Sequence, residues 1–350
     1  MDKILTLIIP AYNMERYLDR CLSSLIVDEK HMMMFEALII NDGSTDRTSE
    51  IGHQYEARRP ESFRVIDKEN GHYGSCVNRG LSEAKGVFIK ILDADDFFDT
   101  LVFKCFLDFL SSEEVKSNAD LVLSDYVSIF EDSDSKLLQE YRSPSPASIS
   151  QICTYDRFKW FIHGLTYKSN ILKSIEYKQI EGIPYTDNQW SLEPMIAVKT
   201  IYRFSNPLYC YSIGREDQSI SDENHSKYLD KEISVIEYLI SFYCQKSPSM
   251  EDNLRGFFKE RLVLSIENIY QLALLTLNRK FIDDNLLNSF DQHLKNTCEE
   301  LYSITNGYST HVLRVKCRII KHWREKSPLL RIEQAIYNIT NRINQLKSTI

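Results

Sequence analysis

The chain has 350 residues, 43% hydrophobic and 26% charged, with a net charge of −8 at pH 7. This length predicts one large domain with an accessory part, and the acidic balance argues against non-specific binding of nucleic acid. The eight cysteines form no Cys-x-x-Cys pair, so we expect reduced thiols in a cytoplasmic protein, without a zinc site or a disulfide framework. We expect no signal peptide, because the first predicted strand begins at Ile4, and no apolar run approaches the roughly 18 residues of a membrane span.

Three apolar segments in the amino-terminal part predict buried strands, at residues 5–9, 37–40 and 89–92. The first two are each followed by a segment with helical spacing. Alternating strands and helices predict an α/β fold with a mostly parallel, Rossmann-like sheet flanked by helices. Ligands bind beyond the carboxyl ends of such strands, so the polar loops at 10–13, 41–46 and 93–96 should line one crevice.

A glycine-rich segment, residues 70–80, lies between the second and third of these loops. It follows a short predicted strand at 63–67 and opens a helix that runs through Ala84. Glycines before a helix let backbone N–H groups approach a phosphate, and Gly71 is the candidate here. The alternative is a plain turn in which Ser75 caps the helix.

The third loop places three carboxylates directly after an apolar strand. Asp93 and Asp95 share one side if the chain stays extended, since side chains alternate along a strand. Clustered carboxylates repel one another, and a divalent cation such as Mg²⁺ or Mn²⁺ relieves that repulsion. The alternative is a polar strand end, with Asp96 capping the next helix.

In order and spacing, the three loops resemble the motifs of the family 2 glycosyltransferases over roughly the first 220 residues. The motifs are, in chain order, Pro10-Ala11-Tyr12-Asn13, Asn41-Asp42-Gly43-Ser44-Thr45-Asp46 and Asp93-Ala94-Asp95-Asp96. The resemblance implies a GT-A fold, and transfer of a sugar with inversion at its anomeric carbon. It also implies a nucleotide-sugar donor, UDP by default, and a role in making bacterial polysaccharides or glycoconjugates.

The resemblance also assigns roles to single residues. Asp42 would accept a hydrogen bond from the base, Asp93 would approach the ribose, and Asp95 with Asp93 would hold Mn²⁺ or Mg²⁺. The donor-binding residues implied in this way are Pro10, Ala11, Tyr12, Asn13, Asp42, Gly71, Asn78, Asp93, Ala94, Arg215 and Ser219. The family often carries Ala-Arg-Asn-x-Gly around Asn78. This chain has Val77 in place of the arginine, and Arg79 is the candidate replacement.

Two more strands are predicted, at 120–126 and 208–213, and Asp187 falls between them at the start of a helix. Aspartate is a common helix cap, which is one interpretation. By resemblance, the catalytic carboxylate of the family precedes such a helix, so Asp187 is the candidate base for the acceptor hydroxyl. Residues 160–165 would line the acceptor cleft, where we expect His163 to pack rather than react.

From residue 225 onward, apolar residues recur at helical spacing with little Gly or Pro. We therefore expect a catalytic domain over 1–224 and a helical accessory domain over 225–350. Residues 311–331 predict a basic amphipathic helix that lies on the inner face of the membrane, where a lipid-linked acceptor would be extended. The alternatives are packing on the helical bundle or a homodimer.

Two other functional classes remain open. A sugar nucleotidyltransferase also has a doubly wound sheet with acidic metal ligands, but usually a glycine-rich, basic signature after the first strand. Residues 10–15 lack both features. The third class is a non-catalytic nucleotide-binding scaffold. We expect the acceptor to be a hydroxyl of a glycan, or of a lipid-linked or protein-linked acceptor. The sugar cannot be read from the sequence, because its specificity depends on the geometry of loops.

Overall fold

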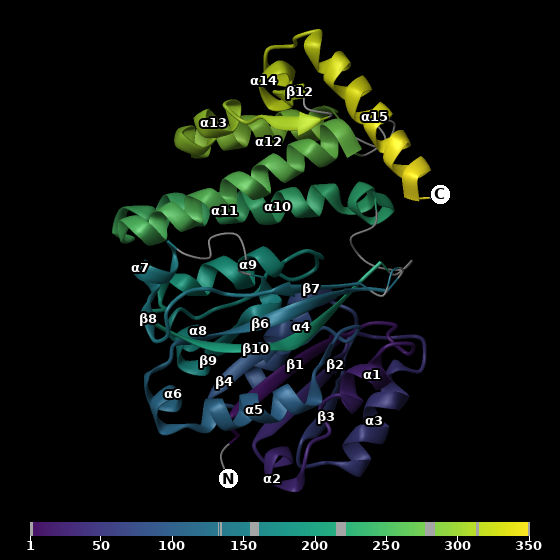
Figure 1. Cartoon of the computed structure of the whole chain (residues 1–350), viewed down its shortest axis with the longest axis vertical. Helices are drawn as coiled ribbons and strands as arrows, with labels where there is room; N and C mark the ends of the chain where they lie inside the picture. The colour runs from purple at the N-terminus through teal and green to yellow at the C-terminus, as the bar shows by residue number, and fades with distance from the viewer. Residues whose placement is uncertain are drawn as a thin grey trace. The chain divides into compact units, whose positions relative to one another are not determined.

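The computed structural model describes residues 3–131, 133, 135–154, 161–214, 222–276, 284–312 and 315–348. The chain divides into two compact units (Figure 1). The first comprises Met1–Gln218 with Glu251–Leu254, and the second comprises Ser219–Met250 with Arg255–Ile350.

The first unit is built on one sheet with the strand order β3-β2-β1-β4-β9-β6-β10-β5, in which β7 pairs with β6 and β8 with β10. The strands are β1 (Leu5–Ala11), β2 (Phe35–Asn41), β3 (Phe63–Asp67), β4 (Phe88–Ile91), β5 (Phe97–Phe98), β6 (Leu121–Phe130), β7 (Ser135–Gln139), β8 (Ala147–Ser148), β9 (Leu165–Lys168) and β10 (Thr200–Ile213). Strand β1 pairs in parallel with β2 and β4, β2 with β3, and β6 with β10. The short β9 runs antiparallel between β4 and β6. The mostly parallel α/β sheet is therefore confirmed.

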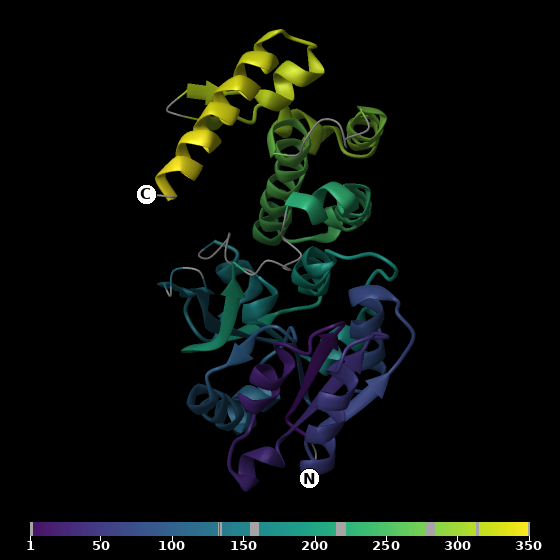
Figure 2. The same ribbon diagram turned by 90° about the vertical axis from the view of Figure 1, so that its right-hand side faces the viewer.

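Helices cover both faces of this sheet (Figures 1 and 2). They are α1 (Leu18–Ser23), α2 (Glu29–Met32), α3 (Thr48–Arg58), α4 (His72–Glu83), α5 (Thr100–Ser111), α6 (Glu113–Asn118), α7 (Ile149–Ile152), α8 (Ser169–Ser174) and α9 (Asp187–Leu192), with 3₁₀ turns at Ile162–Gly164 and Glu193–Ile196. One face buries Leu7 and Ile9 of β1 with Phe106 of α5 in a single core. On the other face α4 lies so close to β1 that a Cβ at Gly80 would come within 2.6 Å of the Ile8 side chain. Burial on both faces explains why these strands are largely apolar.

The second unit is helical, as predicted for the carboxyl-terminal region. Its helices are α10 (Asp222–Lys246), α11 (Asp252–Gln271), α12 (Asp284–Thr297), α13 (Glu299–Asn306), α14 (Ile319–Arg324) and α15 (Leu329–Ser348). A 3₁₀ turn, Ser247–Ser249, and a π-helical turn, Leu272–Thr276, separate some of them, and β11 (Thr310–Val312) pairs with β12 (Val315–Cys317). Among the described helices, none combines the length and the apolar character needed to cross a membrane.

The prediction of one amphipathic helix over residues 311–331 is wrong. This stretch contains most of the β11–β12 hairpin, the six-residue α14 and the start of α15. Ile319 and Ile320 are fully buried, and Trp323 packs on Tyr270 with ring centroids 5.7 Å apart. Ile319, Ile320 and Trp323, three of the apolar residues that suggested a membrane face, therefore pack within their own unit.

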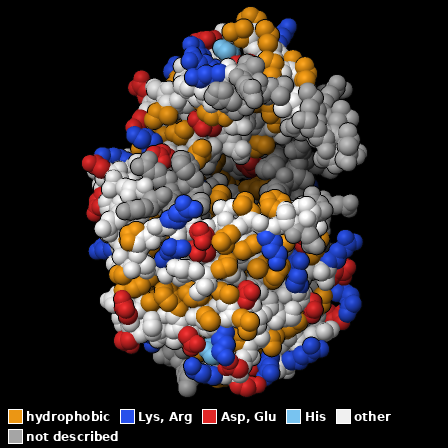
Figure 3. All heavy atoms as spheres, viewed as in Figure 1, with side chains coloured by type: hydrophobic (Ala, Val, Ile, Leu, Met, Phe, Trp, Pro, Cys, Tyr) orange, Lys and Arg blue, Asp and Glu red, His pale blue; other side chains and the backbone are white. Residues whose placement is uncertain are grey.

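Arg324 is one of the basic residues assigned to that helix. Its guanidinium lies 3.8 Å from the ring centroid of Tyr302, and its Nε donates to Asp291 at 2.8 Å. It is a buried structural cation. Arg314 lies outside the described residues. On the face drawn in Figure 3, acidic and basic side chains of the first unit are interspersed rather than gathered by sign.

Candidate active site

The first two predicted loops meet at the carboxyl edge of the sheet, because β1 and β2 are parallel and in register up to Ala11 and Asn41. The N–H of Asn13 donates to Ser44 Oγ at 3.0 Å, and Asn13 Oδ1 accepts the N–H of Thr45 at 2.9 Å. Asn13 has φ of +54°, a left-handed conformation that asparagine tolerates. The two loops thus form one hydrogen-bonded rim.

Asp42 lies just inside this rim and is 3% exposed. Its Oδ1 forms an ion pair with Lys68 Nζ and accepts the N–H of Gly71 at 3.0 Å. Lys68 Nζ also donates to Ser75 Oγ at 2.9 Å. Gly71, predicted to offer its N–H to a phosphate, donates it to Asp42. Sequence reasoning missed Lys68, whose one signal is its position directly after β3.

The remaining residues of the first motif differ in exposure. Tyr12 is 47% exposed, whereas Ala11 is 2% exposed and belongs to the core of the sheet. Pro10 is partly buried at the end of β1. Tyr12 is therefore the most exposed of these three side chains.

Both carboxylate oxygens of Asp93 accept tyrosine hydroxyls. Tyr73 donates to Oδ1 at 2.9 Å, and Tyr209 donates to Oδ2 at 3.4 Å. Burial first, and then the charges of Asp95 and Asp187, raise the pKa of Asp93 to about 7. Neither tyrosine was singled out from the sequence, because each contacts Asp93 from a distant part of the chain.

Asp96 does not cap a helix, contrary to the alternative considered from the sequence. It is 1% exposed and accepts the Tyr209 hydroxyl at 2.7 Å and the N–H of Ser212 at 2.8 Å. Burial and the charges of Asp95 and Asp93 raise its pKa well above the usual range. Asp99, three residues later, is the cap of α5 and accepts the N–H of Leu101 at 3.0 Å.

The acidic loop has a donor set that suits a divalent cation. Asp93, Asp96 and His163 each offer a ligand atom, and these atoms lie within 4.8 Å of one another. His163 Nδ1 is buried without a hydrogen-bond partner. Carboxylate and imidazole ligands suit Mn²⁺, and a cation would relieve the repulsion within the cluster. The predicted pair was Asp93 with Asp95, so His163 and Asp96 extend the set of candidates.

His163 also packs, as expected from the sequence. Its ring stacks on Tyr211 with centroids 4.2 Å apart. Burial lowers its pKa to about 3, so the imidazole is neutral, the form that binds metals. Its carbonyl accepts Lys90 Nζ at 2.6 Å, and burial lowers the pKa of Lys90 to about 7.

Asp95 is held through its backbone. Arg20 Nη2 donates to the carbonyl of Asp95 and to Ser212 Oγ, both at 2.9 Å. The same guanidinium lies 4.7 Å from the ring centroid of Phe97. Arg20 therefore fixes the acidic loop from α1, and no motif pointed to it.

Asp187 is the first residue of α9, and the N-cap position belongs to Thr186. The side chain of Asp187 is exposed, but the protein around it removes enough water to raise its pKa to about 6. Its charge contributes to the raised pKa values of Asp93 and Tyr73, so the three groups are electrostatic neighbours. The structure brings the candidate base and the acidic loop together.

Asn78 has a structural role in the described contacts. Its Nδ2 donates to the carbonyl of Gln179 at 2.8 Å and to Glu181 at 2.7 Å, and its Oδ1 accepts the N–H of Gln179. Arg79, the candidate replacement for the family's arginine, instead pairs with Glu83 at 2.9 Å. Arg215 and Ser219 lie outside the described residues.

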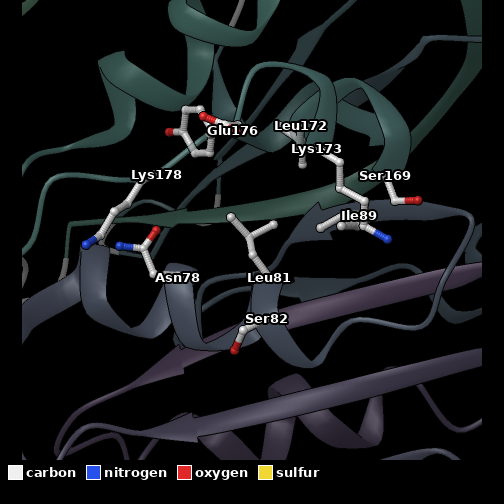
Figure 4. Close-up of a pocket in the computed structure, with 10 residues that line it drawn as sticks. Asn78, Leu81, Ser82, Ile89, Ser169, Leu172, Lys173, Glu176 and Lys178 are labelled. Atoms are coloured by element: carbon white, nitrogen blue, oxygen red, sulfur yellow. The ribbon is translucent and has the colours of Figure 1, made fainter.

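A cavity of about 460 Å³ lies beside α4 and α8 (Figure 4). Its floor includes Leu81, Ile89 and Leu172, with Asn78 at one end. None of the predicted aspartates lines it. The three predicted polar loops therefore do not line this cavity.

Comparison with known proteins gives a consistent picture. Residues 6–163 match the model of Glycosyl transferase family 2. EpsH of Bacillus subtilis, which is named as a glycosyltransferase, is 25% identical over 254 residues, 71% of each chain. An uncharacterized glycosyltransferase of Mycoplasma genitalium, MG060, is 24% identical over 257 residues, 69% of this chain and 80% of its own.

Among solved structures, residues 1–349 of Staphylococcus aureus TarS in complex with UDP-GlcNAc superpose with a TM-score of 0.65. The match covers 97% of this chain and 92% of that one, at 16% sequence identity. Similarity at this level concerns the fold, and it confirms the expected GT-A architecture with its helical carboxyl-terminal region.

Proposed function

The chain belongs to the family 2 glycosyltransferases, and from this premise we propose that it transfers a sugar from a UDP-sugar to an acceptor hydroxyl with inversion. The observation that carries this proposal is that the charges of Asp93 and Asp187 influence each other, while Asp42 lies inside the rim that the first two loops form. The relatives named as glycosyltransferases favour transfer over the nucleotidyltransferase and scaffold alternatives.

Uracil matches the polar groups around Asp42. The base presents one ring N–H between two carbonyls, and the carboxylate of Asp42 accepts that N–H. Lys68, whose three N–H groups bond Asp42, the carbonyl of Glu69 and Ser75, holds this carboxylate in place. The exposed ring of Tyr12 offers a face on which the base stacks. UDP-GlcNAc in the TarS complex supports UDP as the nucleotide.

A divalent cation, Mn²⁺ or Mg²⁺, would be held by Asp93 with Asp95, and Asp96 and His163 are additional candidates. When bound, it would stabilise the negative charge on the departing diphosphate. Arg20 holds the backbone of this loop, and Tyr209 orients Asp93, so the ligands are fixed before the donor arrives.

Asp187 acts as the base. Its carboxylate takes the proton of the acceptor hydroxyl while that oxygen forms a bond to the anomeric carbon. The bond from that carbon to the diphosphate breaks on the opposite side, so the configuration inverts. A pKa of about 6 leaves Asp187 ionised at neutral pH and more basic than an ordinary aspartate.

The acceptor we propose is a glycan or a lipid-linked or protein-linked glycan, built at the cytoplasmic side in bacterial polysaccharide synthesis. Without an amphipathic helix, contact with an anionic membrane would depend on the exposed cations of 311–331, such as Lys316, Arg318 and Arg331. A homodimer through the second unit is the alternative use of this surface.

A donor screen tests the proposal. The full chain is incubated in Mn²⁺ with UDP-glucose, UDP-galactose and their N-acetyl forms, and free UDP is followed. One donor should release UDP in an acceptor-dependent way, and the product of an α-linked donor should be a β-glycoside by NMR. Pyrophosphate exchange instead of UDP release would identify a nucleotidyltransferase.

A further inference from the structure

Two tyrosines hold Asp93, and they differ in their surroundings. Tyr209 of β10 is 1% exposed, packs on Phe98 with ring centroids 5.7 Å apart, and also donates to Asp96 at 2.7 Å. Tyr73 of α4 is half-buried, and its hydroxyl donates to Asp93 Oδ1 at 2.9 Å. Tyr209 belongs to the core of the sheet, whereas Tyr73 reaches the carboxylate from a separate helix.

The first turn of α4 is fastened to residues 178–182. A Cβ at Gly74 would lie 1.8 Å from the carbonyl oxygen of Ile180, so only glycine permits this approach. The N–H of Gly182 donates to the carbonyl of Gly71 at 3.1 Å. Tyr73 therefore sits between two backbone positions that contact the same segment.

Residues 178–182 also hold the first turn of α9. Gln179 Nε2 donates to the carbonyl and the hydroxyl of Thr186, at 2.9 and 2.8 Å. Gln189 Oε1 accepts the N–H of Ile180 at 2.8 Å, and both glutamines are at most 1% exposed. Buried hydrogen bonds in which every group is satisfied favour a single arrangement of the segments they join, here 178–182 and 186–189.

These contacts join three segments into one unit, which we call the α4–α9 frame: residues 71–75, 178–182 and 186–189. Asp187 belongs to the frame and Asp93 to the acidic loop after β4. The hydroxyl of Tyr73 is a direct bond from the frame to Asp93.

We propose that Tyr73 is a positioning residue that sets the separation of Asp187 from Asp93 by tying the α4–α9 frame to the acidic loop. The inference rests on the proposed function, in which Asp93 serves the donor and Asp187 the acceptor. In a displacement the reacting atoms must be held about 3 to 3.5 Å apart, and small misplacements slow the reaction strongly. A hydroxyl on a rigid ring is suited to fixing such a distance.

The first test compares the kinetics of Tyr73→Phe with wild type, using Tyr202→Phe as the matched control. Tyr202 lies near the start of β10, and its hydroxyl donates to the carboxylate of Glu114 at 3.2 Å. Tyr209, which contacts Asp93, lies nearer the other end of the same strand. Tyr73→Phe should lower kcat roughly 10- to 100-fold, as expected for one hydrogen bond to a charged group, with donor KM and UDP affinity within about twofold. Tyr202→Phe should retain wild-type kcat.

A double mutant separates positioning from a general structural effect. If Tyr73 acts through the placement of Asp187, Tyr73→Phe should change kcat by less than about twofold in an Asp187→Asn background. Fully additive losses would overturn the proposal, and so would a kcat for Tyr73→Phe equal to that of wild type.

Hydrogen–deuterium exchange gives a readout that does not depend on turnover. In Tyr73→Phe the amides of residues 178–192 should exchange faster than in wild type, and in Tyr202→Phe they should not. Unchanged exchange in Tyr73→Phe would overturn the proposal. If wild type transfers no sugar, the proposed function fails, and the exchange data alone decide whether Tyr73 ties the frame to Asp93.

Discussion

Buried Asp42 and partly buried Lys68 form an ion pair where the family resemblance places the nucleotide base. The pair favours a base that offers a ring N–H beside a carbonyl. Cytosine has an unprotonated ring nitrogen at that position, so its lone pair would face the carboxylate of Asp42. In the proposed function, selection of the base therefore depends on Asp42, which Lys68 holds in place.

Replacing Lys68 with methionine should weaken UDP binding roughly 10- to 100-fold, since Asp42 loses its counter-ion and the bond that holds it in place. Titration calorimetry measures the affinity for UDP and, in comparison, for CDP. Lys104→Met is the control, because Lys104 pairs with Asp28 at 2.7 Å on the exposed surface. Equal affinity of wild type for UDP and CDP would contradict this account of the base pocket.

The raised pKa of Asp187 predicts a pH dependence. A base works in its ionised form, and the loss of surrounding water raises the pKa of Asp187 to about 6 although its side chain is exposed. Turnover at saturating donor should therefore rise as pH increases through about 6 and level off above it, falling roughly tenfold per unit below. Measuring kcat between about pH 5 and 8 tests this, and a flat profile would exclude Asp187 as the titrating base.

At the scale of elements, the contact between α4 and residues 178–182 places the candidate base. Gly74 looked from the sequence like part of a phosphate-binding loop, but its role here is to allow close packing against Ile180. A glycine that allows an anion to bind and a glycine that allows two backbone segments to pack closely cannot be told apart in a sequence.

Gly74→Ala should destabilise the first unit by roughly 1 to 3 kcal/mol, because a Cβ 1.8 Å from the Ile180 carbonyl forces the backbone to move. Gly256→Ala is the control, since a Cβ at Gly256 in α11 would have no heavy atom within 4 Å. That change should stabilise by roughly 0.5 to 1 kcal/mol, because alanine favours a helix. Thermal melts compare the two, and equal melting temperatures would contradict the packing argument.

Strands were predictable where burial on both faces makes them apolar, as in β1, β2 and β4. The short β9 was not predicted, because four residues carry too little periodicity. Residues 311–331 were misread as a helix, since a hairpin followed by a short helix places apolar residues at similar intervals.

The candidate site was predictable only in part. Carboxylates at strand ends stand out in a sequence, which is how Asp42 and Asp93 became candidates, whereas Asp187 was chosen by resemblance at the start of a helix. Tyr209 was missed because its partner Asp93 is 116 residues away, a pairing that the sheet alone creates. Lys68 follows β3 without any motif of its own, so the sequence offers no reason to choose it.

At the scale of the whole molecule, the outer charges of the second unit decide whether it meets a membrane. If the exposed cations of 311–331 contact the membrane, the protein should bind anionic vesicles at low salt. It should be released at high salt, because salt screens the attraction between these cations and the anionic lipids. Co-sedimentation of the full chain with anionic and with neutral vesicles tests this. Protein that stays in the supernatant with anionic vesicles at low salt would favour a soluble acceptor.

The central claim is that the crevice at the sheet edge is a glycosyltransferase site with Asp187 as its base. The most direct measurement is the transfer rate of Asp187→Asn, with UDP affinity determined on the same protein. We predict that UDP binds as to wild type while transfer slows by a factor of roughly 10² to 10⁴. Wild-type transfer by Asp187→Asn would contradict the account.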